Sequence, residues 1–178
     1  MNKTVTVFGS SIPLPGELEY ESAYKLGKIL GSSRINVCTG GFLGIMEAVS
    51  KGAAESGTEA IGITVNIFNA RPNKYLTKEI RCASLFERLS KLIENGDAYI
   101  ILNGGTGTLL ELSLVWELIN KNLIDAKPCA ALGNMWNLII SEMEKQIIRE
   151  KRKNGLIYCC DSVEDCAAYI IEKLQGKI

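Results

Sequence analysis

Short apolar segments alternate with longer segments of helical period along the chain, and this alternation constrains the fold more than any other feature. Residues 4–8 (TVTVF) and 98–102 (AYIIL) are runs of β-formers, whereas residues 18–30 carry apolar side chains at helical spacing. Strands that are apolar on both faces are covered by helices on both sides, which is typical of a parallel sheet. The sequence therefore predicts a doubly wound α/β fold of Rossmann type, a parallel sheet flanked by helices.

The same patterns predict the other elements. Residues 66–78 are polar and show no period, so they are expected to form a long loop, and long loops in compact domains are often binding segments. With 178 residues and no linker, repeat or low-complexity segment, one domain is expected over residues 1–178. Further strands are expected at 35–39, 60–64, 127–132 and 156–159, and further helices at 43–55, 85–94, 107–120, 135–151 and 163–174.

Composition excludes several classes of function. Lys plus Arg and Asp plus Glu are 20 each, so there is no excess positive charge of the kind that holds nucleic acid. The chain has no histidine, which excludes a Ser-His-Asp triad, a Cys-His pair and a His-ligated zinc. Acid–base catalysis would have to come from carboxylates, Lys, Tyr, Cys or water.

The N-terminus has no long apolar segment of a secretory signal, and no apolar run approaches the ~20 residues that span a bilayer. A cytoplasmic location is expected, where thiols stay reduced. The cysteines are therefore interpreted as small apolar residues; a metal or redox site is the alternative, but the spacing is poor and no metal is expected. They are Cys38, Cys82, Cys129, Cys159, Cys160 and Cys166.

Three predicted strands are followed by segments rich in Gly, Ser and Thr, and two of these segments run directly into helices. Glycine lets a ligand approach the main chain, and the unpaired N–H groups of a helix N-terminus attract anions, most often phosphate. A tight strand–helix turn is the alternative for any one of them. The segments have neither the Lys of a Walker A loop nor G-x-G-x-x-G after the first strand. The candidate phosphate- or nucleotide-binding residues are Ser10, Gly40, Gly41, Gly44, Gly104, Gly105, Thr106, Gly107 and Thr108.

Two charged residues are candidates for catalysis. Glu111 lies four residues after Gly107, one turn into the helix and among leucines, and Arg88 lies 23 residues earlier on the preceding helix. One helix–strand–helix unit separates them and can bring both to one edge of the sheet. The alternatives are that Arg88 is a solvated helix charge and that Glu111 is a first-turn residue favoured by the helix dipole.

These motifs resemble the LOG family, often labelled "lysine decarboxylase", from about residue 4 to the 170s. The matching elements are Phe8-Gly9-Ser10-Ser11, Thr39-Gly40-Gly41-x-x-Gly44, Arg88 and Gly104-Gly105-x-Gly107-Thr108-x-x-Glu111. The resemblance implies that Arg88 and Glu111 are the catalytic pair and that the glycine loop holds phosphate. The chain departs from the family pattern at Leu89, Asn103, Leu110 and Glu47, which shifts the resemblance toward LOG-like nucleotide-binding proteins similar to molybdenum-cofactor carriers.

The resemblance implies a phosphoribohydrolase that releases base and ribose 5-phosphate from a nucleoside 5′-monophosphate without a cofactor. The alternatives are a non-catalytic carrier of a nucleotide or molybdopterin-type cofactor, and a regulatory or subunit-interaction domain. The expected partner is a phosphate-bearing small molecule, with no nucleic acid and no membrane. A homodimer or higher homo-oligomer is also implied, for which the apolar segment 109–119 is a candidate interface; core packing is its alternative role.

Overall fold

Seven strands form one parallel sheet in the order β4-β3-β2-β1-β5-β6-β7. The computed structural model describes residues 2–176. The chain runs from β1 out to β4 at one edge, returns to β5 beside β1, and continues to β7 at the other edge, so the predicted doubly wound α/β fold is confirmed. The strands are β1 (Thr4–Phe8), β2 (Asn36–Thr39), β3 (Ala60–Val65), β4 (Lys78–Cys82), β5 (Ala98–Ile101), β6 (Cys129–Leu132) and β7 (Tyr158–Cys160).

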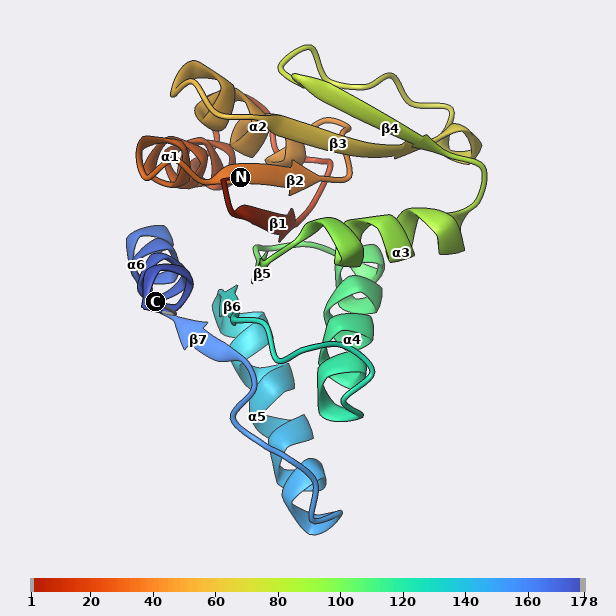
Figure 1. Ribbon diagram of the computed structural model, residues 1–178, viewed down its shortest axis with the longest axis vertical. Coiled ribbons are helices and arrows are strands. Elements are labelled where there is room, and N and C mark those ends of the chain that lie inside the picture. Colours follow the sequence, from red (N-terminus) through yellow and green to blue (C-terminus); the bar gives the residue numbers. More distant parts are fainter. Residues whose placement is uncertain (1, 177–178) are drawn as a thin grey trace.

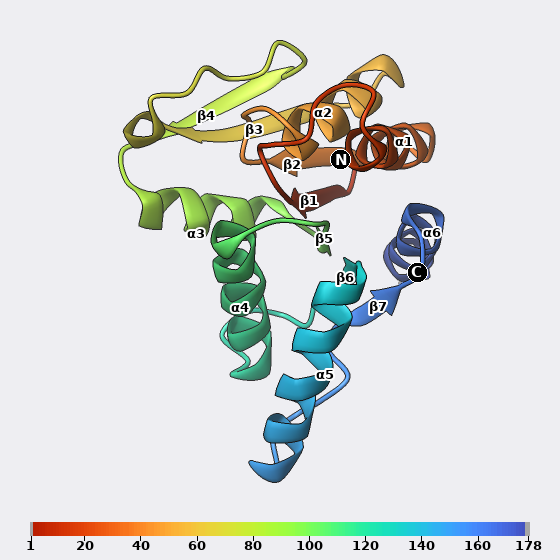
Figure 2. The same cartoon turned by 180° about the vertical axis from the view of Figure 1, so that it is seen from behind.

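The helices cover the two faces of the sheet in two sets of three. One set, α1 (Leu18–Ser32), α2 (Ile45–Glu55) and α6 (Val163–Gln175), packs its apolar side chains against one face. The other set, α3 (Leu85–Asn95), α4 (Thr106–Asn120) and α5 (Asn134–Arg149), packs against the opposite face. Figures 1 and 2 show the two sets on opposite sides of the strands, with α5 extending beyond the sheet. A short 3₁₀ helix, η1 (Asn66–Phe68), follows β3.

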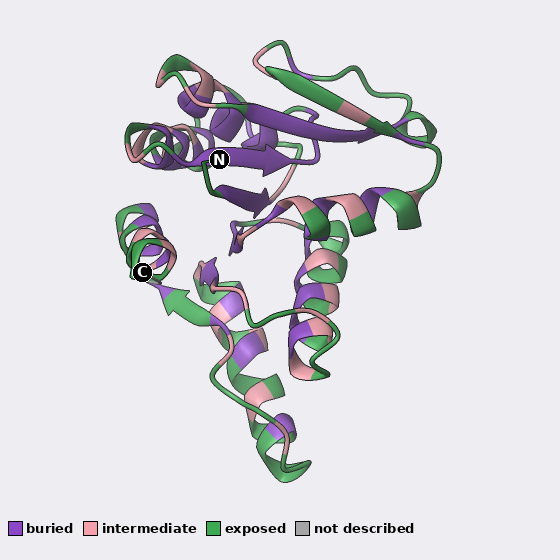
Figure 3. Cartoon of the chain, in the orientation of Figure 1, coloured by how far each residue is buried: buried purple, intermediate pink, exposed green. Residues whose placement is uncertain are grey.

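The central strands are buried along their length, as Figure 3 shows. Every residue of β1, β2, β3 and β5 is buried, as expected of parallel strands that helices cover on both faces. The segment 66–78 is not wholly a loop, because it contains η1 and ends on the first residue of β4. No pattern in the sequence predicted β4, whose residues KEIRC are mostly exposed. An edge strand pairs on one side only and needs no apolar run, so its pattern carried no signal.

The helix 106–120 divides its apolar residues between the core and the surface. Leu112, Val115 and Trp116 pack in the core, whereas Leu109 and Leu110 are exposed. Core packing therefore accounts for much of the apolar segment 109–119. The expectation of an interface between copies of the chain rests on the exposed residues and stays a prediction.

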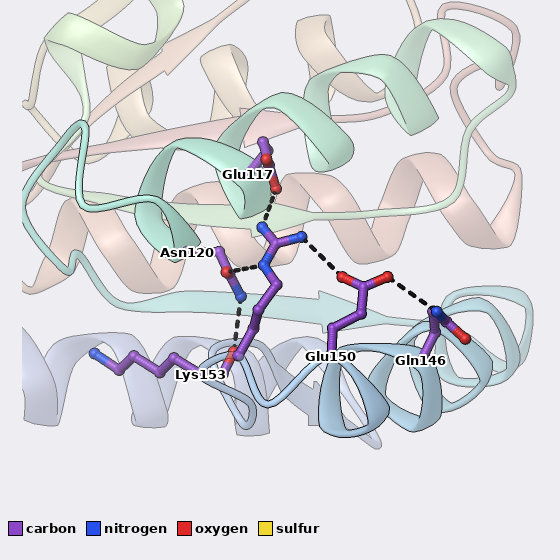
Figure 4. Close-up of polar contacts among 6 residues, drawn as sticks. Glu117, Asn120, Gln146, Glu150 and Lys153 are labelled. Carbon is purple, nitrogen blue, oxygen red and sulfur yellow. Dashed lines mark hydrogen bonds and ion pairs between the residues drawn. The ribbon is translucent and has the colours of Figure 1, made fainter.

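A polar cluster holds the C-terminal ends of α4 and α5 together (Figure 4). Arg152 donates from Nη2 to Glu117 Oε2 at 2.6 Å and from Nε to Asn120 Oδ1 at 2.8 Å. Its Nη1 lies 3.3 Å from Glu150 Oε2, and Gln146 donates to the same carboxylate at 2.9 Å. One guanidinium therefore links the helix that carries the glycine loop to its neighbour.

The burial of most cysteines fits their interpretation as small apolar residues. All six are free, and five are buried, whereas Cys159 is exposed.

Within residues 2–176, no helix is both long enough and apolar enough to cross a membrane.

Trp136 anchors the start of α5 in the core. Its side chain is 1% exposed, and its indole N–H donates to Leu102 O at 3.0 Å. We expect Trp136→Ala to lower the free energy of unfolding by about 3–5 kcal/mol, because it removes a large buried ring. Urea denaturation measures this change. The matched control is Leu138→Ala on the same helix, where the side chain is 61% exposed; a change of more than about 0.5 kcal/mol there would contradict the burial argument.

Candidate functional site

A cavity of about 640 Å³ opens at the carboxyl ends of the central strands. The order of the strands reverses between β1 and β5, and ligands of open α/β sheets bind at such a switch point. We call this space the main cavity. It is lined by Gly9, Ser10, Ser11, Ile12, Phe42, Met46, Phe68, Ala70, Leu85, Arg88, Leu89, Gly105, Thr106, Gly107, Thr108, Leu110 and Glu111.

Arg88 is a buried charge on α3 and not a solvated helix residue. It is 6% exposed, its Nε donates to Ile63 O at 2.9 Å, and its Nη1 lies 3.5 Å from Glu111 Oε1. Burial lowers the pKa of Arg88, while Glu111 counteracts this, and a guanidinium with an ordinary pKa above 12 stays charged. A Cβ at Gly40 would collide with Nη2 of Arg88, so the absence of a side chain there makes room for the guanidinium.

Two aromatic rings flank the same guanidinium. The Arg88 Cζ atom lies 5.8 Å from the ring centre of Phe42 and 5.5 Å from that of Phe68. The rings lie 6.0 Å apart in an edge-to-face arrangement. Such contacts stabilise a cation that has little access to water. Phe68 belongs to η1, so the segment expected to be a binding loop does reach the main cavity.

Glu111 lies in the second turn of α4 and faces Arg88. Its side chain is 12% exposed. Burial raises the pKa of Glu111 to about 7, and the charge of Arg88 opposes this shift. Near neutral pH the carboxyl group is therefore present in both protonation states, which is the condition under which a group can accept or donate a proton readily.

The glycine loop, residues 104–108, joins β5 to α4 at the cavity wall. Gly105 is the N-cap of α4 and no side chain caps this helix, so its first N–H groups are available to an anion. The amide of Ser10 donates to Asn103 O at 2.9 Å and ties the segment after β1 to this loop. Thr108 is 4% exposed and lies against Gly104.

The structure brings many of the predicted site residues together. Those lining the main cavity are Ser10, Arg88, Gly105, Thr106, Gly107, Thr108 and Glu111.

The remaining glycines shape the site from behind or beside it. Gly40, Gly41 and Gly44 do not line the main cavity, and Gly104 lines a neighbouring one. Gly41 has a φ of +79° and its carbonyl accepts two bonds from Asn73, while Gly44 packs on the backbone of residues 10–11.

Sequence reasoning missed the aromatic and aliphatic part of the wall. Phe42, Phe68 and Met46 line the main cavity and were not candidates. Phe42 lies within the second glycine-rich segment, and Phe68 is an isolated aromatic residue in a polar stretch. These two positions were the sequence signals from which both residues could have been predicted. Among residues 2–176, no three Cys, Asp or Glu side chains gather where they could hold a metal ion.

Glu111 predicts how stability depends on pH. The folded chain holds the proton of Glu111 to about pH 7, whereas its ordinary pKa is 4.5. Its contribution to stability is therefore present below about pH 4.5 and is lost as pH rises through about 7. The unmodified protein loses this contribution between pH 4.5 and about 7, whereas a glutamine side chain at this position does not titrate. We therefore expect the free energy of unfolding of Glu111→Gln, minus that of the unmodified protein, to increase with pH over this range. Urea denaturation at several pH values measures the difference. A difference that is constant with pH would contradict this.

Curated proteins with similar sequences include nucleotide-processing enzymes. The chain is 30% identical over 138 residues to the cytokinin riboside 5′-monophosphate phosphoribohydrolase of Rhodococcoides fascians, covering 74% of this chain and 68% of that protein. It is 31% identical to the LOG5 phosphoribohydrolase of Arabidopsis thaliana, covering 82% of this chain and 65% of that protein. It is 36% identical over 120 residues to the pyrimidine/purine nucleotide 5′-monophosphate nucleosidase of Escherichia coli K12, of which it spans only 26%.

Solved structures and a family model match over more of the chain. The molybdenum cofactor binding protein of Rippkaea orientalis superposes with a TM-score of 0.73 at 23% identity, covering 99% of this chain and 97% of that one. The molybdenum cofactor carrier protein of Chlamydomonas reinhardtii superposes with a TM-score of 0.73 at 19% identity, covering 98% and 99%. These likenesses show the fold. The sequence model of the SLOG cluster4 family matches residues 2–167, and the chain therefore belongs to the SLOG cluster4 family, as its resemblance to LOG proteins predicts.

Proposed function

We propose that this protein hydrolyses the N-glycosidic bond of a nucleoside 5′-monophosphate, giving the free base and ribose 5-phosphate. The observation that carries the proposal is the buried pair of Arg88 and Glu111, 3.5 Å apart, in the same cavity as the N-terminus of α4. The named activities of the sequence relatives support this class of reaction.

The phosphate would bind at the glycine loop. Backbone N–H groups at the start of α4 and the hydroxyls of Thr106 and Thr108 supply donors there. The net charge of zero is compatible with this site, because a helix N-terminus and one arginine act locally. Phosphate held at this end places the ribose toward Glu111.

Glu111 would act on the anomeric carbon. The bond from C1′ to the base nitrogen breaks through a transition state with positive charge on the sugar, as in glycoside hydrolysis. The electron pair leaves with the base, which takes up a proton, and a water oxygen bonds to C1′. The carboxylate of Glu111 stabilises the cation or takes the proton of that water, and Arg88 contacts the ribose, the phosphate or the departing base. These steps use this chain's own residues and water.

The proposal predicts release of adenine from AMP. We expect Glu111→Gln to lower kcat/KM by at least about hundredfold, because general acid–base catalysis typically contributes 10²–10⁴-fold. Chromatography of the products measures the rate. The matched control is Glu117→Gln on the same helix, since Glu117 is half exposed and outside the main cavity. Intact protein that releases no base from any nucleoside monophosphate would overturn the proposal.

The pKa of Glu111 predicts a pH profile for the same reaction. If the carboxylate is the active form, kcat/KM rises with pH and levels off above about 7, where Glu111 of the free protein has lost its proton. Rates measured from about pH 5 to about pH 9 test this. A profile that is flat across this range would assign the reaction to another group.

A carrier of a nucleotide or pterin-type cofactor is the second candidate function. Leu89 and Leu110 line the main cavity beside Arg88 and Glu111, and both are positions where the chain departs from the LOG pattern. Apolar neighbours leave the site with fewer groups to act on a substrate. Ligand-induced thermal stabilisation without product would favour the carrier, and turnover would favour the hydrolase.

A further inference from the structure

A second cavity of about 450 Å³ adjoins the main one, and we call it the side cavity. Its lining residues are Ser10, Glu19, Asn103, Gly104, Asn134 and Met135. Ser10 lines both cavities, and the consecutive residues Gly104 and Gly105 line one each. A phosphate at the glycine loop would therefore lie between the two spaces.

The side cavity has an exposed polar wall, and one hydrogen bond joins two of its side chains. Asn103 donates from Nδ2 to Glu19 Oε1 at 2.9 Å, which joins the end of β5 to the first turn of α1. A Cβ at residue 133 would collide with Asn103 Oδ1, and Gly133, with a φ of +119°, avoids that collision. The side-chain amide of Asn103 thus lies between α1 and Gly133, the residue before α5. Asn134, another lining residue, is the first residue of α5.

The chemistry of this wall differs from that of the main cavity. Two amides, a hydroxyl and a carboxylate can exchange hydrogen bonds with hydroxyl groups. Glu19 is the one charged side chain among the lining residues, and it is negative, so a second anionic group there would be repelled. The wall therefore fits a neutral, hydroxyl-bearing group.

We propose that the site binds a nucleotide whose phosphate carries such a group, of the class of nucleoside diphosphate sugars. The nucleoside would occupy the main cavity, the phosphates would lie at the glycine loop, and the sugar would occupy the side cavity. In doubly wound sheets, two-part nucleotide ligands bind across the crevice at the point where the strand order reverses. This proposal rests on the proposed function, since it assumes that the loop binds the nucleotide's phosphate.

Calorimetric titration with ADP-glucose and ADP tests the proposal, with chromatography to verify that both ligands stay intact; AMP is left out because the proposed function predicts its hydrolysis. We expect ADP-glucose to bind at least about tenfold more tightly than ADP, whose terminal phosphate faces Glu19. Equal or weaker binding of ADP-glucose overturns the proposal. If AMP is hydrolysed while the sugar adds no affinity, the proposed function stands and only this inference fails. If no nucleotide binds, both fail.

A substitution that fills the side cavity supplies the second test. We expect Met135→Trp to remove the tenfold preference for ADP-glucose over ADP while the KM for AMP hydrolysis stays the same. The matched control is Met143→Trp on the same helix, because Met135 is 45% exposed, Met143 is 47% exposed, and Met143 lies outside both cavities. An unchanged preference in Met135→Trp, in protein that unfolds at the same temperature as the control, overturns the proposal.

Discussion

The burial of one guanidinium is the constraint on which the site depends. Arg88 lies 6% exposed beneath a cavity, and a charge in such a position is costly unless it is paired and hydrogen-bonded. The carbonyl of Ile63 in β3 and the carboxylate of Glu111 on α4 supply those partners. The alignment of α3, β3 and α4 is therefore coupled to the placement of a single side chain.

The same burial sets the properties of Glu111. Loss of water raises the pKa of its carboxyl group to about 7, although a positive charge stands 3.5 Å away. Removing one partner of such a pair leaves an uncompensated buried charge. This lowers the stability of the protein more than replacing both partners by apolar residues does. The pair is thus weak evidence for stability and stronger evidence for a chemical role, because perturbed pKa values gather at functional sites.

The proposed phosphate end of the site relies on main-chain groups and not on excess charge. Residues 104–108 leave the start of α4 uncapped by side chains, and the amide of Ser10 bonds to the carbonyl of Asn103. Neutral overall composition and a local anion site are compatible for this reason. The main cavity therefore combines this loop with the charged pair of Arg88 and Glu111 and with apolar and aromatic side chains, among them Met46, Phe42 and Phe68.

The sequence by itself determined the class of fold and the chemical inventory. Runs of β-formers at β1 and β5 predicted a parallel sheet covered on both faces, and the lack of histidine left carboxylates, Lys, Tyr, Cys and water for acid–base catalysis. The glycine-rich segments after the strands pointed to the edge of the sheet where the main cavity lies, because strand–turn–helix signals are local.

Tertiary structure alone decided which of these residues meet. β4 is an exposed edge strand without a pattern, Phe68 reaches the site through η1, and Gly40 serves Arg88 instead of a ligand. The contact of Arg88 with Glu111 and the wall made by Glu19 and Asn103 join residues 23 and 84 positions apart. Such contacts depend on how helices pack across the sheet, which no local pattern of side chains encodes.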